Sequence, residues 1–161
     1  MDINAWLDIS PFDWPSVGAA LLCGCVVGLE RQLRGKPVGI RTSALIVLGT
    51  YLFVAAADSL QGSAIDPTRI IGQVVTGVGF LGAGVMMTRD GTVLGVTSAA
   101  SIWVLAALGV CVAISNGQTA IKLAFLVVSI LYGVDLLEKT THRFTRGVHA
   151  RFESISRNHH R

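Results

Sequence analysis

The sequence predicts an all-α membrane protein with five transmembrane helices. Three observations lead to this fold class: 52% of the 161 residues are hydrophobic, only 14% are charged, and the apolar residues gather into five separate runs. Typical soluble domains carry about 25% charged residues. Each run holds roughly 18–21 residues, the length that a helix needs to cross about 30 Å of hydrocarbon.

The five runs divide the chain into a leader, one membrane domain and a tail. Residues 1–15 form an external or interfacial leader, since tryptophan favours the headgroup level. The membrane domain covers residues 16–137, with helices at about 16–33, 40–58, 69–88, 95–115 and 119–137. Residues 138–161 form a basic cytosolic tail, whose apolar residues keep the spacing of an amphipathic helix on the inner leaflet.

The basic residues predict the orientation of the chain. With the N-terminus outside and the C-terminus inside, 11 of the 13 Lys and Arg residues lie in the first loop, the third loop and the tail. Cytoplasmic loops are enriched in these residues, so we expect this orientation. The net charge of +3 then reflects topology and contacts with lipid headgroups, and we expect no nucleic-acid partner.

Small residues line two of the predicted helices. Gly72, Thr76, Gly79 and Ala83 step at helical spacing and therefore share one face of the third helix. In a bilayer such a face lets another helix approach closely, so we expect a tightly packed transmembrane hairpin here. A second helix-contact signal lies in the first helix, at Gly24 and Gly28.

An internal repeat relates two helical hairpins. Displacing the chain by 56 residues aligns Gly28 with Gly84, Gly35 with Gly91 and Gly39 with Gly95. Both hairpins have their loop inside, which is the parallel-repeat arrangement of some transporters. The first copy is charged at its inner end, where the second copy has two methionines and a threonine.

The charged inner end is the first candidate site, a polar cluster of Glu30, Arg31, Arg41 and Thr42. A charge at mid-bilayer costs about 2.5–3.5 kcal/mol on insertion scales and less near the interface. One interpretation is an interfacial ion cluster that fixes the helix ends. The other is that Glu30 faces a cavity and binds a cation or a proton, while the two arginines set its charge state.

A second candidate site lies on the outer side, where Asp58, Asp66 and Arg69 flank the second loop and Gln73 lies one turn further along the helix. Carboxylates with water suit hydrated Mg²⁺, which uses few protein ligands, although two loop acids are also commonly just solvated. We expect no other cofactor. The GxGxxG string at residues 77–82 does not follow a strand that opens a βαβ unit, and no other catalytic motif is present, so we expect no enzyme.

Four runs together resemble the MgtC/SapB family: GLERQ at residues 28–32, GKPVGIRT at 35–42, RIIGQVVTGVGFLGAGV at 69–85 and GVTSAASIW at 95–103. The resemblance covers residues 17–137. It implies a multi-pass protein of about five helices in the bacterial inner membrane, linked to growth under low magnesium and to virulence. Longer members carry a cytosolic ACT-like domain, and 24 tail residues are too few to fold one.

Two functions follow from these observations. The resemblance implies a regulatory protein that contacts other membrane proteins, among them ATP synthase and proteins that regulate phosphate uptake. The small-residue faces would then dock the helices of such a partner or of a second copy. The alternative is a small transporter or channel for Mg²⁺ or another ion, with Glu30 near the inner gate.

Overall fold

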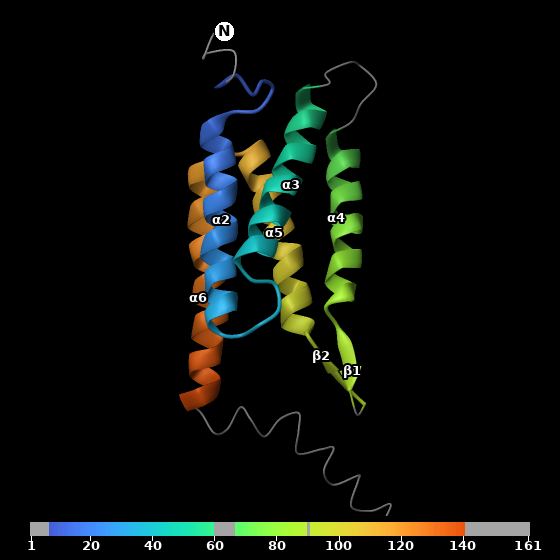
Figure 1. Ribbon diagram of the computed structural model, residues 1–161, viewed down its shortest axis with the longest axis vertical. Coiled ribbons are helices and arrows are strands. Elements are labelled where there is room, and N and C mark those ends of the chain that lie inside the picture. The colour runs from blue at the N-terminus through green and yellow to red at the C-terminus, as the bar shows by residue number, and fades with distance from the viewer. Residues whose placement is uncertain (1–6, 60–66, 90, 141–161) are drawn as a thin grey trace, which may run out of the picture. The chain divides into compact units, whose positions relative to one another are not determined.

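The computed structural model describes residues 7–59, 67–89 and 91–140. The chain divides into two units, Met1–Val127 and Val128–Arg161. Helix α6 begins in the first unit and continues into the second. In chain order (Figure 1), the elements are α2 (Trp14–Leu33), α3 (Ile40–Ser59), α4 (Pro67–Gly84), β1 (Met87–Arg89), β2 (Thr92–Leu94), α5 (Val96–Ile114) and α6 (Gly117–Thr140).

The predicted fold class is confirmed, because five long helices account for the five apolar runs. Four of them, α2, α3, α5 and α6, are long and apolar enough to cross a membrane. In the part of the chain that the structure describes, α4 is not among these candidates. Its arginine, its glutamine and its many glycines lower the mean hydropathy of its 18 residues. The predicted helix in the tail falls at residues 141–161 and lies outside the described residues.

The core of the first unit forms where α3 packs against α2 and α5. Buried residues on α3 recur every three or four positions, from Ser43 through Val47, Thr50 and Val54 to Ala57, so one face of the helix points inward. Helix α5 also packs against α4 and α2. Helix α4 contributes little to this core, since only Val78 and Gly82 are buried among those of its residues whose burial is described.

Helix α2 begins with a side-chain cap. The side chain of Asp13 accepts a hydrogen bond from the backbone N–H of Ser16 at 2.8 Å. Pro15 lies in the first turn, where a missing N–H leaves no helical hydrogen bond unmade. The cap places the start of the helix at Trp14, two residues before the predicted start.

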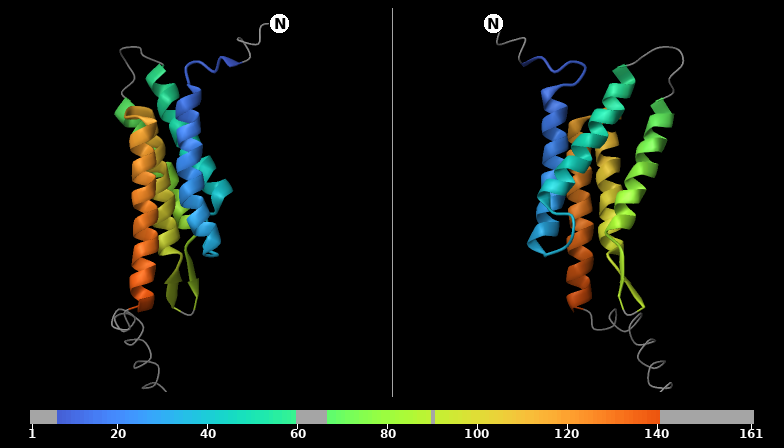
Figure 2. Two further views of the ribbon diagram at one scale, coloured as in Figure 1. Left: turned by 90° about the vertical axis from the view of Figure 1, so that its left-hand side faces the viewer. Right: turned by 45° about the vertical axis from the view of Figure 1, so that its right-hand side comes forward.

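The prediction of a helix over residues 69–88 is wrong at its C-terminal end. Helix α4 ends at Gly84, and Met87–Leu94 forms a two-stranded antiparallel ribbon, which we call the β-ribbon. Its register pairs Met87 with Leu94, Thr88 with Val93, and Arg89 with Thr92. Figure 2 shows the β-ribbon continuing past the ends of α4 and α5.

Two glycines in and after the β-ribbon have backbone conformations that an α-helix does not contain. Gly91 in the turn and Gly95 after β2 have φ angles of 76° and 90°, a left-handed region that side chains rarely adopt. A Cβ atom at Gly95 would also collide with the carbonyl oxygen of Val85. The sequence Asp90-Gly91 is a frequent two-residue hairpin turn, a signal that counting apolar residues overlooks.

Candidate functional site

Arg31 is a buried cation at the end of the first unit where α2 ends and α5 begins. It lies in the last turn of α2 and is only 3% exposed. Its Nη2 donates hydrogen bonds to Ser98 Oγ in the first turn of α5 and, at 3.5 Å, to the carbonyl oxygen of Pro37 in the α2–α3 loop. A buried charge is costly unless it is hydrogen-bonded. Arg31 therefore fastens α2, this loop and α5 to one another.

Several hydrogen bonds hold the α2–α3 loop against the ends of α2 and α3. The backbone N–H of Lys36 donates to the Arg31 carbonyl at 3.0 Å, and the N–H of Ile40 donates to Gln32 Oε1 at 3.3 Å. Ser43 Oγ donates to the Val38 carbonyl at 3.3 Å. Val38 is buried with a φ of 69°, a conformation that is unusual for a β-branched residue. Packing against the helices thus determines the path of the loop.

Glu30 does not join this arginine. Its Oε1 lies 2.6 Å from Arg34 Nε, and its side chain is 8% exposed. Residues four apart meet on one face of a helix, whereas neighbouring residues point about 100° apart, which is why Glu30 and Arg31 face different surroundings. Among the described residues, Glu30 Oε2 and Arg31 Nε are both buried without a hydrogen-bond partner.

The polar cluster predicted from the sequence therefore differs from the one in the structure. Arg41 and Thr42 are exposed, and Arg34, which the prediction left out, is the ion-pair partner of Glu30. Ser98, the partner of Arg31, also escaped prediction because it lies 67 positions further along the chain. The i,i+4 spacing of Glu30 and Arg34 was the available sequence signal for the observed pair.

The two sets of small residues lie in different environments. A Cβ atom at Gly24 would overlap the backbone of Ala44, and one at Gly28 would lie 2.6 Å from the Cα atom of Ile40. These two glycines therefore let α2 and α3 approach closely, as expected of such a pair.

The four small residues of α4 do not pack within the described part of the chain. Gly72, Thr76, Gly79 and Ala83 are all exposed, and a Cβ atom at Gly72 or Gly79 would meet no atom within 4 Å. Helix α4 instead contacts α5 near Gly82, where a Cβ atom would lie 3.5 Å from the Ala99 carbonyl oxygen. We expected these four residues to pack against another helix of this chain, and the structure shows that, among the described residues, they do not.

A polar pocket of about 430 Å³ opens at the other end of the unit. Its polar lining comes from Asp13, Ser16, Tyr51, Asp58 and Ser59. Asp13 caps α2 and lies 3.4 Å from the hydroxyl of Tyr51, which donates to it. The hydrogen bond from the Ser16 backbone N–H lowers the pKa of Asp13 below its usual value.

Of the predicted outer residues, only Asp58 lines this pocket. Arg69 and Gln73 are exposed on α4, and Asp66 lies outside the described residues. Asp13 and Tyr51 were missed, because 38 positions separate them and no local pattern links them. No group of three or more His, Cys, Asp or Glu side chains that could hold a metal ion occurs among the described residues.

Comparison with known proteins shows which family the sequence matches. The model of the MgtC family matches residues 17–140, which covers α2 from its fourth residue onward and all of α3 to α6. The chain belongs to the MgtC family. The family resemblance of the four sequence runs is thereby confirmed.

Curated relatives of this MgtC-family protein come from several bacteria. It is 46% identical over 101 residues to "Putative magnesium transporter YhiD" of Escherichia coli K12, a match covering 58% of this chain and 46% of that protein. It is 38% identical over 109 residues to Protein MgtC of Salmonella typhimurium, covering 68% and 46% of the two chains. Protein MgtC of Brucella abortus is 37% identical over 112 residues, covering 69% and 47%. The chain thus spans about half the length of these relatives, and no solved structure matches it.

Proposed function

We propose that this protein is a regulatory protein of the bacterial inner membrane. It acts in ion homeostasis or in the response to magnesium limitation, through helix contacts with other membrane proteins or with a second copy of itself. Family membership and the magnesium-related name of one relative support the physiological setting. The observation that carries the regulatory role is the outward-facing small-residue surface of α4, which we call the α4 face: Gly72, Thr76, Gly79 and Ala83.

The α4 face is suited to contact with another helix. Helices in a bilayer associate through close van der Waals packing, because lipid chains are as apolar as the side chains. Exposed glycines offer a partner helix a close approach to the backbone, and Gln73 on the same helix is an exposed amide that a polar partner could satisfy. Lipid alone would leave that amide without a partner, which is costly.

The contacts of Glu30 and Arg31 support a structural role for these two charges. An ion carrier needs a carboxylate that can take up and release its cargo, yet Glu30 is paired with Arg34 and its side chain is only 8% exposed. Arg31 is committed to Ser98 and the α2–α3 loop. These contacts fit the interpretation of an ion cluster that fixes helix ends.

Replacing Gly79 tests the docking role. Gly79→Leu should abolish co-purification of cross-linked partner proteins, or energy transfer between two labelled copies, while the folded yield stays at the wild-type level. The matched control is Gly18→Leu, because Gly18 is exposed on α2 with no atom within 4 Å of a Cβ. Partner capture that survives in Gly79→Leu contradicts the proposal.

Transport of Mg²⁺ or another ion is the second candidate function. The outer pocket, with the carboxylates of Asp13 and Asp58, favours it, as does the printed name of the Escherichia coli relative. Purified protein in proteoliposomes should then carry an ion flux that Glu30→Gln or Asp58→Asn reduces. Flux no greater than that of empty vesicles excludes transport by this chain and leaves the docking role in place.

A further inference from the structure

The β-ribbon stands where the membrane-spanning part of the chain begins. Its second strand ends at Leu94, and α5, one of the candidate membrane spans, starts at Val96. Figures 1 and 2 show that the β-ribbon projects beyond the ends of α4 and α5, on the same side as the α2–α3 loop. The hydrogen bond from Arg31 to Ser98 joins the last turn of α2, next to this loop, to the first turn of α5, next to the β-ribbon. Both therefore lie at the same membrane boundary.

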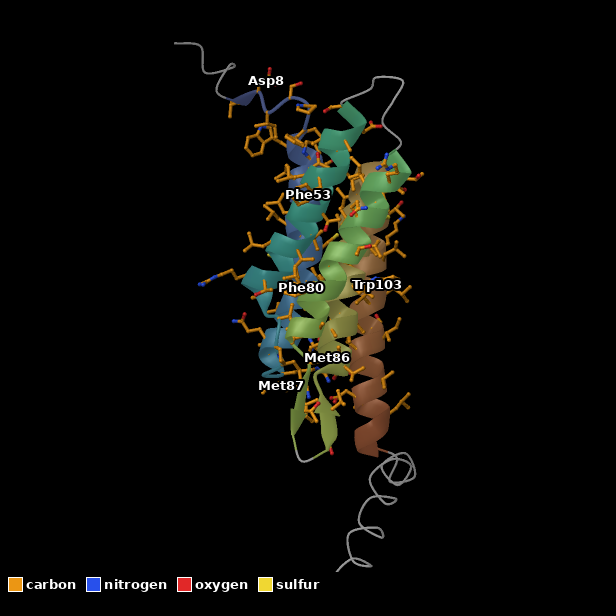
Figure 3. The ribbon with its side chains drawn as sticks, turned by 90° about the vertical axis from the view of Figure 1, so that its right-hand side faces the viewer. Asp8, Phe53, Phe80, Met86, Met87 and Trp103 are labelled. Carbon is orange, nitrogen blue, oxygen red and sulfur yellow. The ribbon has the colours of Figure 1, made fainter. Side chains whose placement is uncertain are left out.

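The base of the β-ribbon exposes large apolar side chains. Met86 is 42% exposed, Met87 66%, Val93 55% and Leu94 49%. Figure 3 shows Met86 and Met87 where the β-ribbon follows α4. Clusters of exposed apolar side chains mark contact with a protein or a membrane.

The polarity of the β-ribbon changes step by step along its register. The pair nearest the helices, Met87 and Leu94, is wholly apolar. The next pair, Thr88 and Val93, is half apolar, and the last, Arg89 and Thr92, is polar. A two-stranded ribbon facing a protein groove has no reason to follow such an order, whereas a membrane interface has the same gradient along its normal.

The neighbouring charges complement phospholipid headgroups. Lys36 and Arg41 are exposed at the same end of the unit, and basic side chains beside a membrane are attracted to anionic headgroups. The open edges of the β-ribbon carry unpaired backbone N–H and C=O groups, which hydrocarbon cannot satisfy. Headgroups and interfacial water can satisfy them. Strands of three residues also offer a short edge for pairing with another protein strand.

We propose that the β-ribbon is an interfacial anchor that stands along the membrane normal in the phospholipid headgroup layer. Met87 and Leu94 contact the upper acyl chains, Val93 lies at intermediate depth, and Thr92 lies among the headgroups. The anchor fixes the height at which α4 and α5 enter the bilayer. This inference does not depend on the proposed function, because it concerns the lipid contact of a different surface.

Depth measurement on the full chain tests the anchor. The three native cysteines are replaced by alanine, and single spin labels are attached through Met87→Cys, Thr92→Cys, Val93→Cys or Leu94→Cys. The protein is reconstituted into vesicles of phosphatidylethanolamine and phosphatidylglycerol. Accessibility to oxygen, which is enriched in the acyl region, is compared with accessibility to a water-soluble nickel complex. Trp103→Cys, exposed on the candidate membrane span α5, and Asp8→Cys, exposed outside the helices, serve as membrane and water references.

The oxygen-to-nickel ratio should be highest at positions 87 and 94, intermediate at 93 and lowest at 92. Ratios at all four positions equal to that of Asp8→Cys would place the β-ribbon in water and overturn the proposal. Low accessibility to both reagents would show that protein covers the β-ribbon. Ratios all equal to that of Trp103→Cys would place it in the acyl core. Either result also overturns the proposal.

A second pair of variants keeps the test independent of labelling. Leu94→Asp should reduce the amount of folded protein recovered from membranes, because the aspartate would carry charge into the acyl region. Thr92→Asp should leave recovery unchanged, since it lies among headgroups. Equal recovery of both variants would contradict the depth order.

Discussion

The two hairpins related by the internal repeat use the same kind of residue in opposite ways. In the α2–α3 hairpin, Gly24 and Gly28 are buried against the neighbouring helix. In the α4–α5 hairpin, Gly72, Gly79 and Gly84 have open space where a Cβ would lie. A small residue permits close approach but does not attract a helix by itself. Burial of the first pair therefore depends on how the opposing helix α3 is held.

The ends of the hairpins where the connecting segments lie explain part of the difference. Helices α3 and α5 begin at equivalent positions of the repeat, Ile40 and Val96, but α2 continues to Leu33 whereas α4 ends at Gly84, the equivalent of Gly28. The extra turn of α2 carries Glu30 and Arg31. The second copy has Met86 and Met87 there and leads into the β-ribbon. The charged copy is held by polar contacts inside the protein, and the neutral copy exposes its side chains.

The largest effect should come from filling the closed contact. Gly28→Leu should destabilise the fold by about 3 kcal/mol, at the upper end of overpacking costs, because its Cβ would lie 2.6 Å from the Cα atom of Ile40. The repeat-equivalent Gly84→Leu should change stability little. Denaturation in detergent, followed by circular dichroism, measures both, and equal losses would remove the difference between the hairpins.

Converting the charged end to the neutral one should have the next largest effect. Arg31→Met gives the first copy the residue that the second has at Met87, and should cost about 1.5–3 kcal/mol, the range for hydrogen bonds to charged groups. The Pro37 carbonyl and Ser98 Oγ would lose their donor. Met87→Ala, at a residue that is 66% exposed, should stay within about 0.5 kcal/mol. An Arg31→Met protein as stable as the wild type would show that the contacts of Arg31 with the α2–α3 loop and α5 do not stabilise the fold.

Removing the acceptor should have a smaller effect than removing the cation. Ser98→Ala should cost about 1–2 kcal/mol, because one buried hydrogen bond of Arg31 is lost while the other remains. Its repeat equivalent, Thr42→Ala, is exposed and should be nearly neutral. The double variant Arg31→Met/Ser98→Ala should be less destabilised than the sum of the single variants. Additive losses would mean that the two side chains act independently.

The smallest effect concerns the outer end, where Asp13 of the first copy corresponds to Arg69 of the second. Asp13→Ala should cost about 0.5–1 kcal/mol at neutral pH through loss of the helix cap, and Arg69→Ala should cost less.

The cost of Asp13→Ala should depend on pH. The Ser16 backbone N–H lowers the folded-state pKa of Asp13 below its ordinary value of 3.8, so the ionised cap stabilises the fold fully above that value. The stabilisation disappears as pH falls through the lower, folded-state pKa. Unfolding curves at several pH values should therefore converge for wild type and Asp13→Ala on acidification, and a constant difference would argue against an ionised cap.

The amino-acid sequence determined the membrane class, the five long helices and the family, because these depend on composition, on the length of apolar runs and on local motifs. It also indicated the close contact at Gly24 and Gly28. Periodicity identifies residues that share one face of a helix, but it does not say which neighbour, if any, that face meets. The exposed α4 face is therefore a result of the tertiary structure.

Tertiary structure alone decided the partners of the charged and capping residues. Arg31 meets Ser98 and Asp13 meets Tyr51 across 67 and 38 positions of the chain, and no local rule links residues so far apart. The pairing of Glu30 with Arg34 is the exception, because residues four apart meet on one face of any α-helix. The left-handed backbone at Gly91 and the close contact of Gly95 with Val85 also became visible only in the tertiary structure. A continuous apolar run shows how long a segment is and not where its backbone changes direction.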